Sequence, residues 1–337
     1  MNPLGERGIF NLDMTHEPDK VLPAYPDPLD AIVLAGTDDN PRRMIKGQNK
    51  AFLEIGTKPL VRRVAEALLD ADSVGRIFVV GPLERLQAAL AGLPDRVQPV
   101  AQVGKVIANA WAAIHAAEAW HLERHDNAVD VERPWLVLSS DLPLISPEAV
   151  DDFVARCTAV DGQSREGNAM LCGVAEEASL RQYYPGDGRP GIKRPYVNYA
   201  DCRIRLANIY VGRPRKLTNQ RFLQTGFEHR KAAKLKNVLA LAWDFLSQPA
   251  GWKAAWLSLR MQATLMAERS GSRFYPSLRA GNSLRVTEEV TSKVLGGPIR
   301  VVITPYGELS LDADNEEDFQ VLNDRFDEWK TYPPVDS

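Results

Sequence analysis

The sequence is short of cysteine and contains no long apolar run, and each shortage excludes a class of protein. Its three cysteines, Cys157, Cys172 and Cys202, are far apart and form no Cys-x-x-Cys pair. We therefore expect neither a disulfide framework nor a zinc knuckle. No stretch approaches the roughly 20 consecutive apolar residues that a membrane-spanning helix needs, so we expect no membrane partner.

An excess of charge is also lacking. The chain has 41 lysines and arginines against 44 aspartates and glutamates, a formal net charge of -3 at pH 7. This balance gives no electrostatic reason to expect nucleic acid as a partner, and any basic site must be local. The N-terminus has neither the charged start nor the apolar stretch of a signal peptide, which predicts a cytoplasmic protein.

What the chain does contain is typical of a globular protein. Of its 337 residues, 45% are hydrophobic and 25% are charged, which allows a sizeable buried core. The length fits about two domains, or one large domain with an insertion. Residues 1–28 are punctuated by prolines and show no sustained periodicity, which predicts a loosely attached N-terminal arm.

Short apolar runs alternate with longer helical patterns over the first half of the chain. Continuous runs such as Ile32–Ala35 suit strands that are buried on both faces. Strands and helices that alternate at this spacing predict an α/β fold with a parallel, doubly wound sheet. The predicted strands cover residues 30–35, 76–80, 97–100 and 135–139, and the predicted helices cover residues 59–69, 83–90, 106–120 and 147–157.

The pattern changes in the second half. Strand-like segments at residues 169–174 and 206–211 are followed by a mainly helical block, and strand character returns at residues 299–304. We therefore predict an α/β domain of residues 29–214 and 296–330 with a helical insertion at residues 215–295. The insertion is rich in apolar side chains, so we expect it to pack on the sheet, with a homodimer face as the second alternative. These side chains are Trp243, Phe245, Trp252, Trp256, Leu257 and Met261.

The loop after the first predicted strand is rich in cationic side chains, namely Arg42, Arg43, Lys46 and Lys50. In a doubly wound sheet, ligands bind outside the carboxyl ends of the strands. Arginine and lysine side chains gathered at such a strand end suit phosphate oxygens. Their spacing is also compatible with a solvated basic loop, so both interpretations stay open.

Two further loops carry aspartates. Asp141 directly follows the predicted strand at residues 135–139, where a carboxylate can bind Mg²⁺ together with substrate phosphates. Asp312 and Asp314 would point the same way if their segment is extended, which would place two carboxylates on one side. The alternatives are a simple turn at Asp141 and a helix cap at Asn315.

Taken in order, these motifs resemble the nucleotidyltransferases with a MobA-like NTP transferase domain, named after a molybdenum-cofactor guanylyltransferase. The resemblance spans most of residues 30–160 and 298–325, and the region between matches more loosely. Each motif is weak alone, but their order is moderately specific. The matching stretches are residues 31–36, Arg43-Met44, residues 50–60, residues 140–143 and residues 311–319.

The resemblance implies a Rossmann-like, doubly wound, mostly parallel sheet of the nucleotide-diphospho-sugar transferase type. It also implies an enzyme that transfers a nucleotidyl group from an NTP to a small phosphorylated acceptor, releases pyrophosphate and requires Mg²⁺. By the same resemblance, Arg43 and Lys50 would be catalytic. The metal would be bound by Asp141 and Asp314, with Asp312 beside them, and we expect Asp141 and Asp314 to lie within about 8 Å of each other.

Position in the family pattern also implies residues that bind the nucleotide and the acceptor. Gln102 and Gly104 lie in a loop that would contact the base, and Arg194, Arg205 and Asn208 lie where related enzymes place the acceptor. For the acceptor segment, a basic strand face in solvent is the alternative. The other residues assigned to the nucleotide are Leu34, Ala35, Gly36, Thr37, Arg42 and Lys46.

The chain departs from the family in its glycine-rich signature. Where the family reads Leu-Ala-Gly-Gly-x-Gly-x-Arg-Met, this chain loses two glycines and gains two residues between Gly36 and Met44. Glycines there let backbone N–H groups approach phosphates, so a non-catalytic nucleotide-binding homologue is one alternative. A GT-A-type glycosyltransferase that uses a nucleotide sugar is another, because Asp312-Ala-Asp314 forms an Asp-x-Asp motif.

Overall fold

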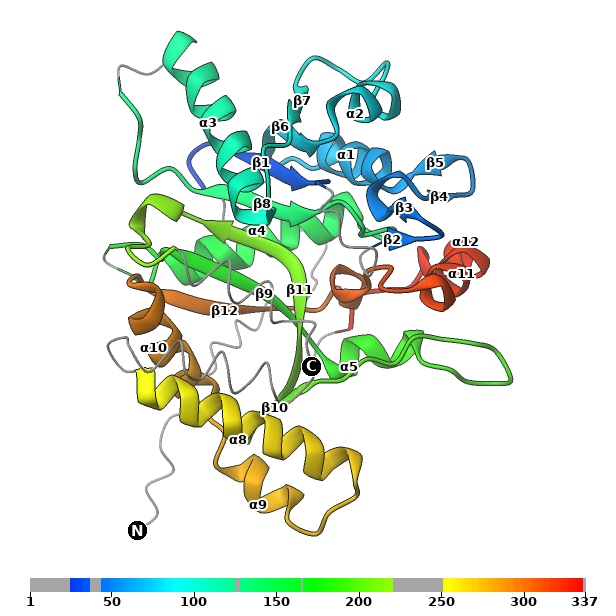
Figure 1. Ribbon diagram of the computed structural model, residues 1–337, viewed down its shortest axis with the longest axis vertical. Helices are drawn as coiled ribbons and strands as arrows, with labels where there is room; N and C mark the ends of the chain where they lie inside the picture. Colours follow the sequence, from blue (N-terminus) through cyan, green and yellow to red (C-terminus); the bar gives the residue numbers. More distant parts are fainter. Residues whose placement is uncertain (1–24, 37–43, 125–127, 165, 221–250, 336–337) are drawn as a thin grey trace.

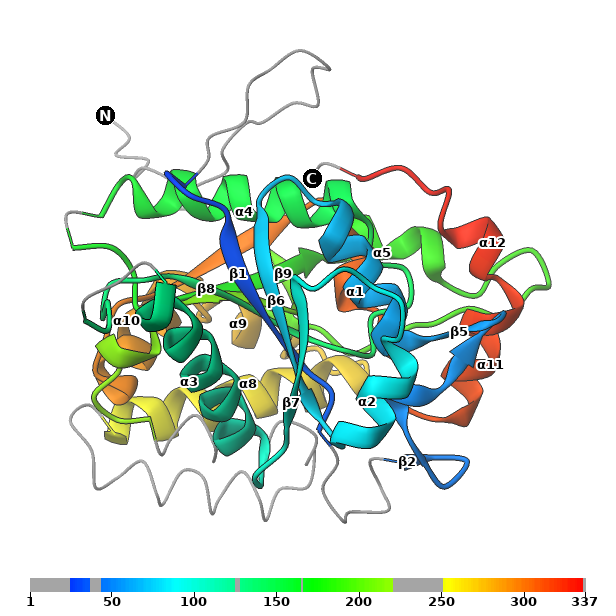
Figure 2. The ribbon, with the colours of Figure 1, turned by 90° about the horizontal axis from the view of Figure 1, so that it is seen from above.

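Figure 1 shows the computed structural model of the chain, which describes residues 25–36, 44–124, 128–164, 166–220 and 251–335. One large sheet crosses the molecule, and helices cover both of its faces (Figures 1 and 2). The apolar runs of the sequence form the strands of this sheet, and the amphipathic segments between them form the helices. The fold is therefore α/β.

The strands of the large sheet are β1 (Leu29–Leu34), β6 (Val74–Gly81), β7 (Val97–Ala101), β8 (Trp135–Ser139), β9 (Met170–Glu176), β10 (Val197–Asn198), β11 (Arg203–Gly212) and β12 (Ile299–Thr304). They are arranged in the order β12-β9-β11-β8-β1-β6-β7, and β10 pairs with β11. All pairs are parallel except those of β11, which runs antiparallel to β8, β9 and β10. The sheet is thus mostly parallel, and its strand order reverses beside β1.

The helices are α1 (Leu60–Asp70), α2 (Leu83–Ala89), α3 (Val106–Arg124), α4 (Pro147–Asp161), α5 (Glu177–Leu180), α8 (Gly251–Arg269), α9 (Tyr275–Ala280), α10 (Leu284–Leu295), α11 (Glu316–Asp324) and α12 (Phe326–Trp329). Side-chain caps fix where several of them begin. Ser146 accepts a hydrogen bond from the Ala149 N–H at the start of α4, and Asn315 accepts one from the Asp318 N–H at the start of α11. The cap at Asn315 is the one that the sequence analysis offered as an alternative to a metal site.

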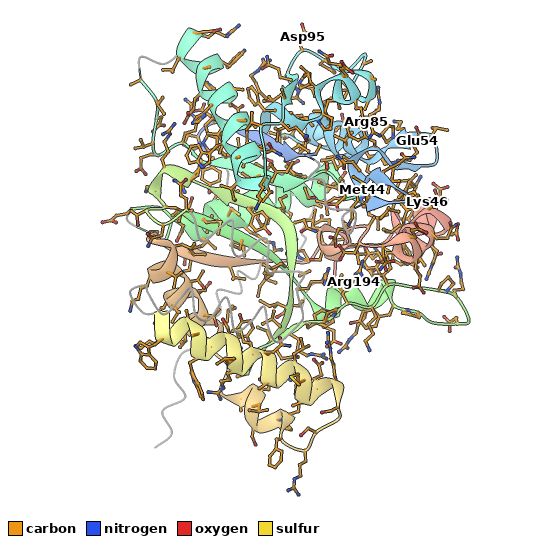
Figure 3. All side chains as sticks on the ribbon, viewed as in Figure 1. Met44, Lys46, Glu54, Arg85, Asp95 and Arg194 are labelled. Atoms are coloured by element: carbon orange, nitrogen blue, oxygen red, sulfur yellow. The ribbon has the colours of Figure 1, made fainter. Side chains whose placement is uncertain are left out.

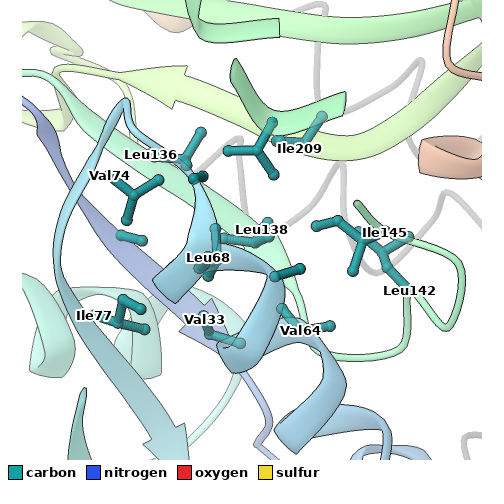
Figure 4. Close-up of a cluster of buried hydrophobic side chains, with 14 of the residues drawn as sticks. Val33, Val64, Leu68, Val74, Ile77, Leu136, Leu138, Leu142, Ile145 and Ile209 are labelled. Atoms are coloured by element: carbon teal, nitrogen blue, oxygen red, sulfur yellow. The ribbon is translucent and has the colours of Figure 1, made fainter. Parts of the chain in front are cut away.

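α1 and α4 cover one face of the sheet, and the main core lies beneath them (Figure 4). Val33 of β1, Ile77 of β6 and Leu138 of β8 pack there against Val64 and Leu68 of α1, and all five side chains are fully buried. Alternate residues of these strands point to the opposite face because side-chain direction alternates along a strand. Burial on both faces explains why the strands read as continuous apolar runs.

α3, α8 and α10 cover the other face (Figure 2). α10 packs against β12, and Val290 and Val294 of α10 join Ala254 of α8 in one buried cluster with β9 and β12. Trp252 and Trp256 on α8 are 64% and 60% exposed and take no part in that cluster. These two side chains therefore do not contribute to the expected packing of the block on the sheet. Trp243 and Phe245 lie outside the described residues.

Several short strands and 3-10 helices were not predicted from the sequence. Between β1 and α1 the chain forms the hairpins β2 (Met44–Ile45) with β3 (Gln48–Asn49) and β4 (Glu54–Ile55) with β5 (Lys58–Pro59). The 3-10 helix η2 (Lys50–Phe52) joins the two hairpins. A second 3-10 helix, η5 (Gly307–Ser310), follows β12 and leads to Asp312. Asp312 and Asp314 thus follow a helical turn that was not predicted from the sequence.

The boundaries of the predicted arm and helical insertion stay predictions.

Within the parts of the chain that the structure describes, no helix is both long and apolar enough to span a membrane.

Candidate active site

Lys50 is fixed at the carboxyl end of β1 by its local structure. It begins η2, where the side-chain oxygen of Asn49 accepts a hydrogen bond from the Ala51 N–H at 3.0 Å. The Asn49 side chain also donates to the carbonyl of Ala35, the residue that follows β1, at 2.9 Å. The backbone of Lys50 is therefore anchored to the end of a buried strand, and the residue is only 7% exposed.

Two aspartates from distant parts of the sequence converge on the Lys50 ammonium. The Nζ of Lys50 lies 3.6 Å from Oδ2 of Asp141 and 3.3 Å from Oδ1 of Asp314. Asp141 follows β8, the neighbour of β1 in the sheet, and it also accepts a hydrogen bond from the Ser139 hydroxyl. Because both carboxylates contact one atom, they lie within the separation of about 8 Å that we expected for a shared metal site.

Burial and charge act in opposite directions on Lys50. Burial alone would lower the pKa of its ammonium, but Asp141, Asp314 and Asp312 outweigh this effect and raise the pKa above its usual value. The pKa of Asp312 is raised as well, first by burial and then by repulsion from Asp141 and Asp314. Lys50 is therefore a cation at neutral pH, surrounded by carboxylates that repel one another.

The antiparallel direction of β11 brings Arg205 to the same edge of the sheet. Arg205 pairs with Ala175 near the carboxyl end of β9, because β11 begins where the parallel strands end. Its guanidinium donates to the carbonyl of Ser310 at 3.1 Å and lies 3.4 Å from Asp312 and 3.9 Å from Asp314. A residue predicted for the acceptor thus lies beside those predicted for the metal.

Arg194 reaches the cluster from the loop that precedes β10. It forms an ion pair with Asp318 and lies 3.6 Å from Oδ2 of Asp314. Its Nε is buried, and none of the described residues accepts a hydrogen bond from it. The side chains of Arg194 and Arg205 are 14% and 18% exposed, so the alternative of a solvent-facing basic strand is wrong for both.

Lys46 lies further out, on the turn between β2 and β3. Its φ of 51° is in the left-handed region, its backbone N–H donates to Glu316 at 3.2 Å, and its Nζ lies 5.6 Å from the centre of the Phe319 ring. Figure 3 shows Met44 and Lys46 close to α11. The hairpin thus packs on the first turn of α11, next to the segment that carries Asp314.

The loop that was predicted to contact the base is held by a residue that the sequence analysis missed. The side-chain oxygen of Asn109 on α3 accepts hydrogen bonds from the N–H groups of Val103 at 2.8 Å and Gly104 at 3.0 Å. Its Nδ2 lies so close to Gly36 that a Cβ on Gly36 would approach it to 2.4 Å. Gln102 also lies beside Gly36, since its Oε1 would be 3.5 Å from a Cβ on that glycine.

Asn109 therefore joins the end of β1 to the loop that follows β7. It is 4% exposed. The available signal was a polar residue inside the otherwise apolar stretch Val106–Ile114, but its partners could not be read from the sequence.

The remaining predicted residues fall into two groups. Leu34 and Ala35 lie at the end of β1, where the carbonyl of Leu34 accepts a hydrogen bond from the Ser140 N–H at 3.2 Å. Asn208 is buried in β11, next to Ile209, which pairs with Leu138 of β8. It thus lies inside the sheet. Thr37, Arg42 and Arg43 lie outside the described residues, so their predicted roles stay predictions.

The cluster contains the donor set that Mg²⁺ prefers. Carboxylate oxygens of Asp141 and Asp314 reach one point, although the described part of the chain contains no group of three or more acidic, histidine or cysteine side chains that could hold a metal by itself. Mg²⁺ is usually bound by one or two carboxylates together with substrate phosphates. The two aspartates therefore fit a metal that binds together with a phosphate chain.

A mostly parallel sheet with cations and carboxylates at the carboxyl end of its strands is the architecture of a nucleotide-binding transferase. The family model that matches is the MobA-like NTP transferase domain, and it covers residues 31–275. The chain belongs to this family and is a nucleotidyltransferase. The resemblance inferred from the sequence is confirmed.

Two solved structures are similar to the chain, and the first of them supports the fold. A hypothetical transferase from Thermus thermophilus is 23% identical, with a TM-score of 0.55, and the match covers 86% of this chain and 99% of that one. A 4-diphosphocytidyl-2C-methyl-D-erythritol synthase from Anaerococcus prevotii DSM 20548 is 10% identical, with a TM-score of 0.42, and the match covers 89% and 96%. No curated protein matches the chain.

Proposed function

We propose that the enzyme moves an NMP group from an NTP to a small phosphorylated acceptor, releases pyrophosphate and requires Mg²⁺. The observation that carries this proposal is the convergence of Lys50, Asp141 and Asp314 at the carboxyl end of β1 and β8. A buried lysine suits a phosphate chain, and paired carboxylates suit a hard cation. The two requirements of nucleotidyl transfer thus meet within one cluster.

Lys50 binds the phosphates of the NTP in this proposal, together with Arg42 and Arg43 of the preceding loop. Its charge balances the charge that develops on the α-phosphate and on the leaving pyrophosphate. The backbone of Leu34–Thr37 and the loop of Gln102 and Gly104 bind the rest of the nucleotide. Asn109 sets the distance between these two segments through its contacts with Val103, Gly104 and Gly36.

Asp141 and Asp314 hold Mg²⁺, with Asp312 behind them. When bound, the metal polarises the α-phosphate and neutralises the pyrophosphate that leaves. Asp312 is 3% exposed and pairs with Arg205, so its part is to balance charge behind the two less deeply buried ligands. Ser139 donates to Asp141 and orients its carboxylate.

Arg194 and Arg205 bind the phosphate of the acceptor. Both guanidinium groups lie within 4.0 Å of Asp314, at 3.6 and 3.9 Å, so an anion bound by them would lie next to the metal ligands. Asn208 supports this segment from within β11. An oxygen of the acceptor phosphate attacks the α-phosphorus, the bond between the α-phosphorus and its bridging oxygen to the β-phosphate breaks, and that oxygen leaves with pyrophosphate.

The test is a screen for pyrophosphate release. The enzyme is incubated with Mg²⁺, each of four NTPs and a panel of phosphorylated sugars, alcohols and carboxylic acids. We expect one NTP and one class of acceptor to release pyrophosphate, and Asp141→Asn to abolish the release. Release of nucleoside diphosphate from a nucleotide sugar instead would favour the glycosyltransferase alternative. Binding of an NTP without turnover by any acceptor would favour the non-catalytic alternative.

A further inference from the structure

Lys50 lies between the two carboxylates that are proposed to share the metal. Its Nζ is 3.6 Å from Asp141 and 3.3 Å from Asp314, so its charge stands at the point toward which both carboxylates are directed. We propose that Lys50 competes with Mg²⁺ for this point and leaves it only when the phosphates of an NTP offer another partner. This inference rests on the proposed function, because it concerns how that same site binds its two ligands.

The anchoring of Lys50 supports such an exchange. Its backbone is fixed by the cap of η2 at Asn49, whereas its four-carbon side chain ends in a point charge with three rotatable donors. Rotation of the side chain can therefore move the charge while the backbone stays in place. Arg194 and Arg205, in contrast, are held by Asp318 and by the carbonyl of Ser310.

The electrostatics of the cluster make the exchange selective. The ammonium of Lys50 lies against Asp141 and Asp314 and repels a divalent cation at close range. Asp314 keeps Arg194 and Arg205 as partners when Lys50 moves. An NTP draws Lys50 to its phosphates and frees Oδ2 of Asp141 and Oδ1 of Asp314, the two oxygens that face Lys50, for Mg²⁺. Each ligand then strengthens the binding of the other by the same factor.

The exchange predicts opposite effects of one substitution on two affinities. In Lys50→Met, calorimetric titration with Mg²⁺ alone, or with Mn²⁺ alone, should give metal binding about tenfold to hundredfold tighter than in the parent, because the competing charge is gone. The affinity for each NTP in the presence of Mg²⁺ should fall in the same variant. Asp141→Asn added to Lys50→Met should remove the gain in metal binding.

Lys58→Met is the matched control. Lys58 is an exposed lysine on β5 that pairs with Glu66, away from the cluster, so its removal should leave metal affinity unchanged. Equal affinity of the parent and Lys50→Met for metal alone would overturn the exchange.

A second measurement keeps the inference testable if Lys50→Met does not fold. Metal is titrated into the parent protein with and without a saturating NTP analogue that cannot react at its α-phosphate. We expect metal binding to be at least about tenfold tighter with the nucleotide. Equally tight metal binding without nucleotide would contradict the exchange and leave the proposed function intact, whereas failure of the parent to bind any NTP would contradict the proposed function.

Discussion

Among single residues, Lys50 and Arg43 are expected to contribute most to nucleotide binding. Lys50→Ala and Arg43→Ala should each weaken binding of the NTP with Mg²⁺ by about tenfold to hundredfold, because a buried charge-assisted hydrogen bond contributes about 1.5 to 3 kcal/mol. Calorimetric titration measures the change, with Lys58→Ala as the control for loss of a lysine elsewhere. Equal affinity in the parent and both variants would place the phosphates at another site.

Gly36 and Asn109 allow a sharper test at the residue scale. A Cβ on Gly36 would approach Nδ2 of Asn109 to 2.4 Å, so Gly36→Ala must displace that side chain and the loop that it holds. We expect Gly36→Ala to raise KM for the NTP and to lower the free energy of unfolding, because the displaced Asn109 side chain is a poorer acceptor for the loop. Asn109→Ala should cost about 1 to 3 kcal/mol of stability, because the N–H groups of Val103 and Gly104 lose their acceptor.

The double variant provides the control for this contact. If the clash is the cause, Gly36→Ala adds little to the effect of Asn109→Ala on KM, since the atom that it would strike is absent. Fully additive effects on KM would show that the two residues act separately.

From the sequence, we could predict the location of those residues whose type and position in the chain relate them directly to the ends of the strands. The convergence of Asp141 and Asp314 could be predicted because loops that follow the strands of a parallel sheet meet at one edge of it. The roles of Lys50 and of both aspartates stay predictions. The roles of Asn109 and Asp318 could not be predicted, because they depend on contacts with a loop and with Arg194 that no local pattern encodes. The spacing of Lys50, Asp141 and Asp314 along the sequence also could not predict that Lys50 contacts both aspartates directly.

Among the elements, η5 connects the core to the segment of the proposed metal ligands and carries a buried acid, Glu308. Glu308 is 7% exposed, and its carboxylate accepts a hydrogen bond from the Tyr183 hydroxyl at 3.3 Å. Burial, with smaller repulsion from Asp152 and Glu148, raises the pKa of Glu308 from 4.5 to about 7. The buried carboxyl is thus neutral in acid and becomes charged as the pH rises through neutrality.

Glu308 should therefore make the fold less stable as the pH rises. Because its pKa is higher in the folded than in the unfolded state, its favourable contribution is complete below pH 4.5 and is lost as the pH passes about 7. Glu308→Gln should match the parent near pH 4.5 and exceed its free energy of unfolding by about 3 kcal/mol at pH 8. Urea unfolding at both pH values measures this, with the exposed Glu84→Gln as the control. A difference that does not depend on pH would contradict the assignment.

The elements also show where the sequence was insufficient. The strand at β11 was expected from its apolar residues, but its antiparallel direction depends on pairing with β8 and β9, and that direction brings Arg205 to the site. The hairpins β2–β3 and β4–β5 are two residues per strand, too short to produce an alternating pattern. The 3-10 helix before Asp312, in which Leu309 is buried, was also not predicted from the sequence.

For the whole molecule, the α/β architecture could be predicted because strands buried on both faces give continuous apolar runs separated by amphipathic helices. The packing of the helical insertion is harder to predict from its sequence. α8 and α10 pack on β9 and β12 through small and β-branched side chains, while Trp252 and Trp256 face outward. A tryptophan is equally apolar in a core and at an interface, so its type alone does not reveal which of these it occupies.

The homodimer stays a prediction at this scale. If Trp252 and Trp256 form the face, light scattering should give a molar mass that rises from one chain toward two with concentration, and Trp252→Glu with Trp256→Glu should keep it at one chain. Trp135→Glu is unsuitable as a control because Trp135 is buried, so the exposed Leu83→Glu on α2 serves instead. A constant mass of one chain at all concentrations would exclude the dimer.

Transfer of a labelled nucleotidyl group tests the central claim most directly. The enzyme is given Mg²⁺, the acceptor found in the pyrophosphate screen, and the NTP labelled either at its α-phosphate or at its γ-phosphate. We predict that the α-label appears in the acceptor in amounts equal to the pyrophosphate released, that the γ-label stays in pyrophosphate, and that Asp141→Asn transfers neither. Transfer of the γ-label to the acceptor, or release of the α-label only as free nucleotide, would contradict nucleotidyl transfer at this site.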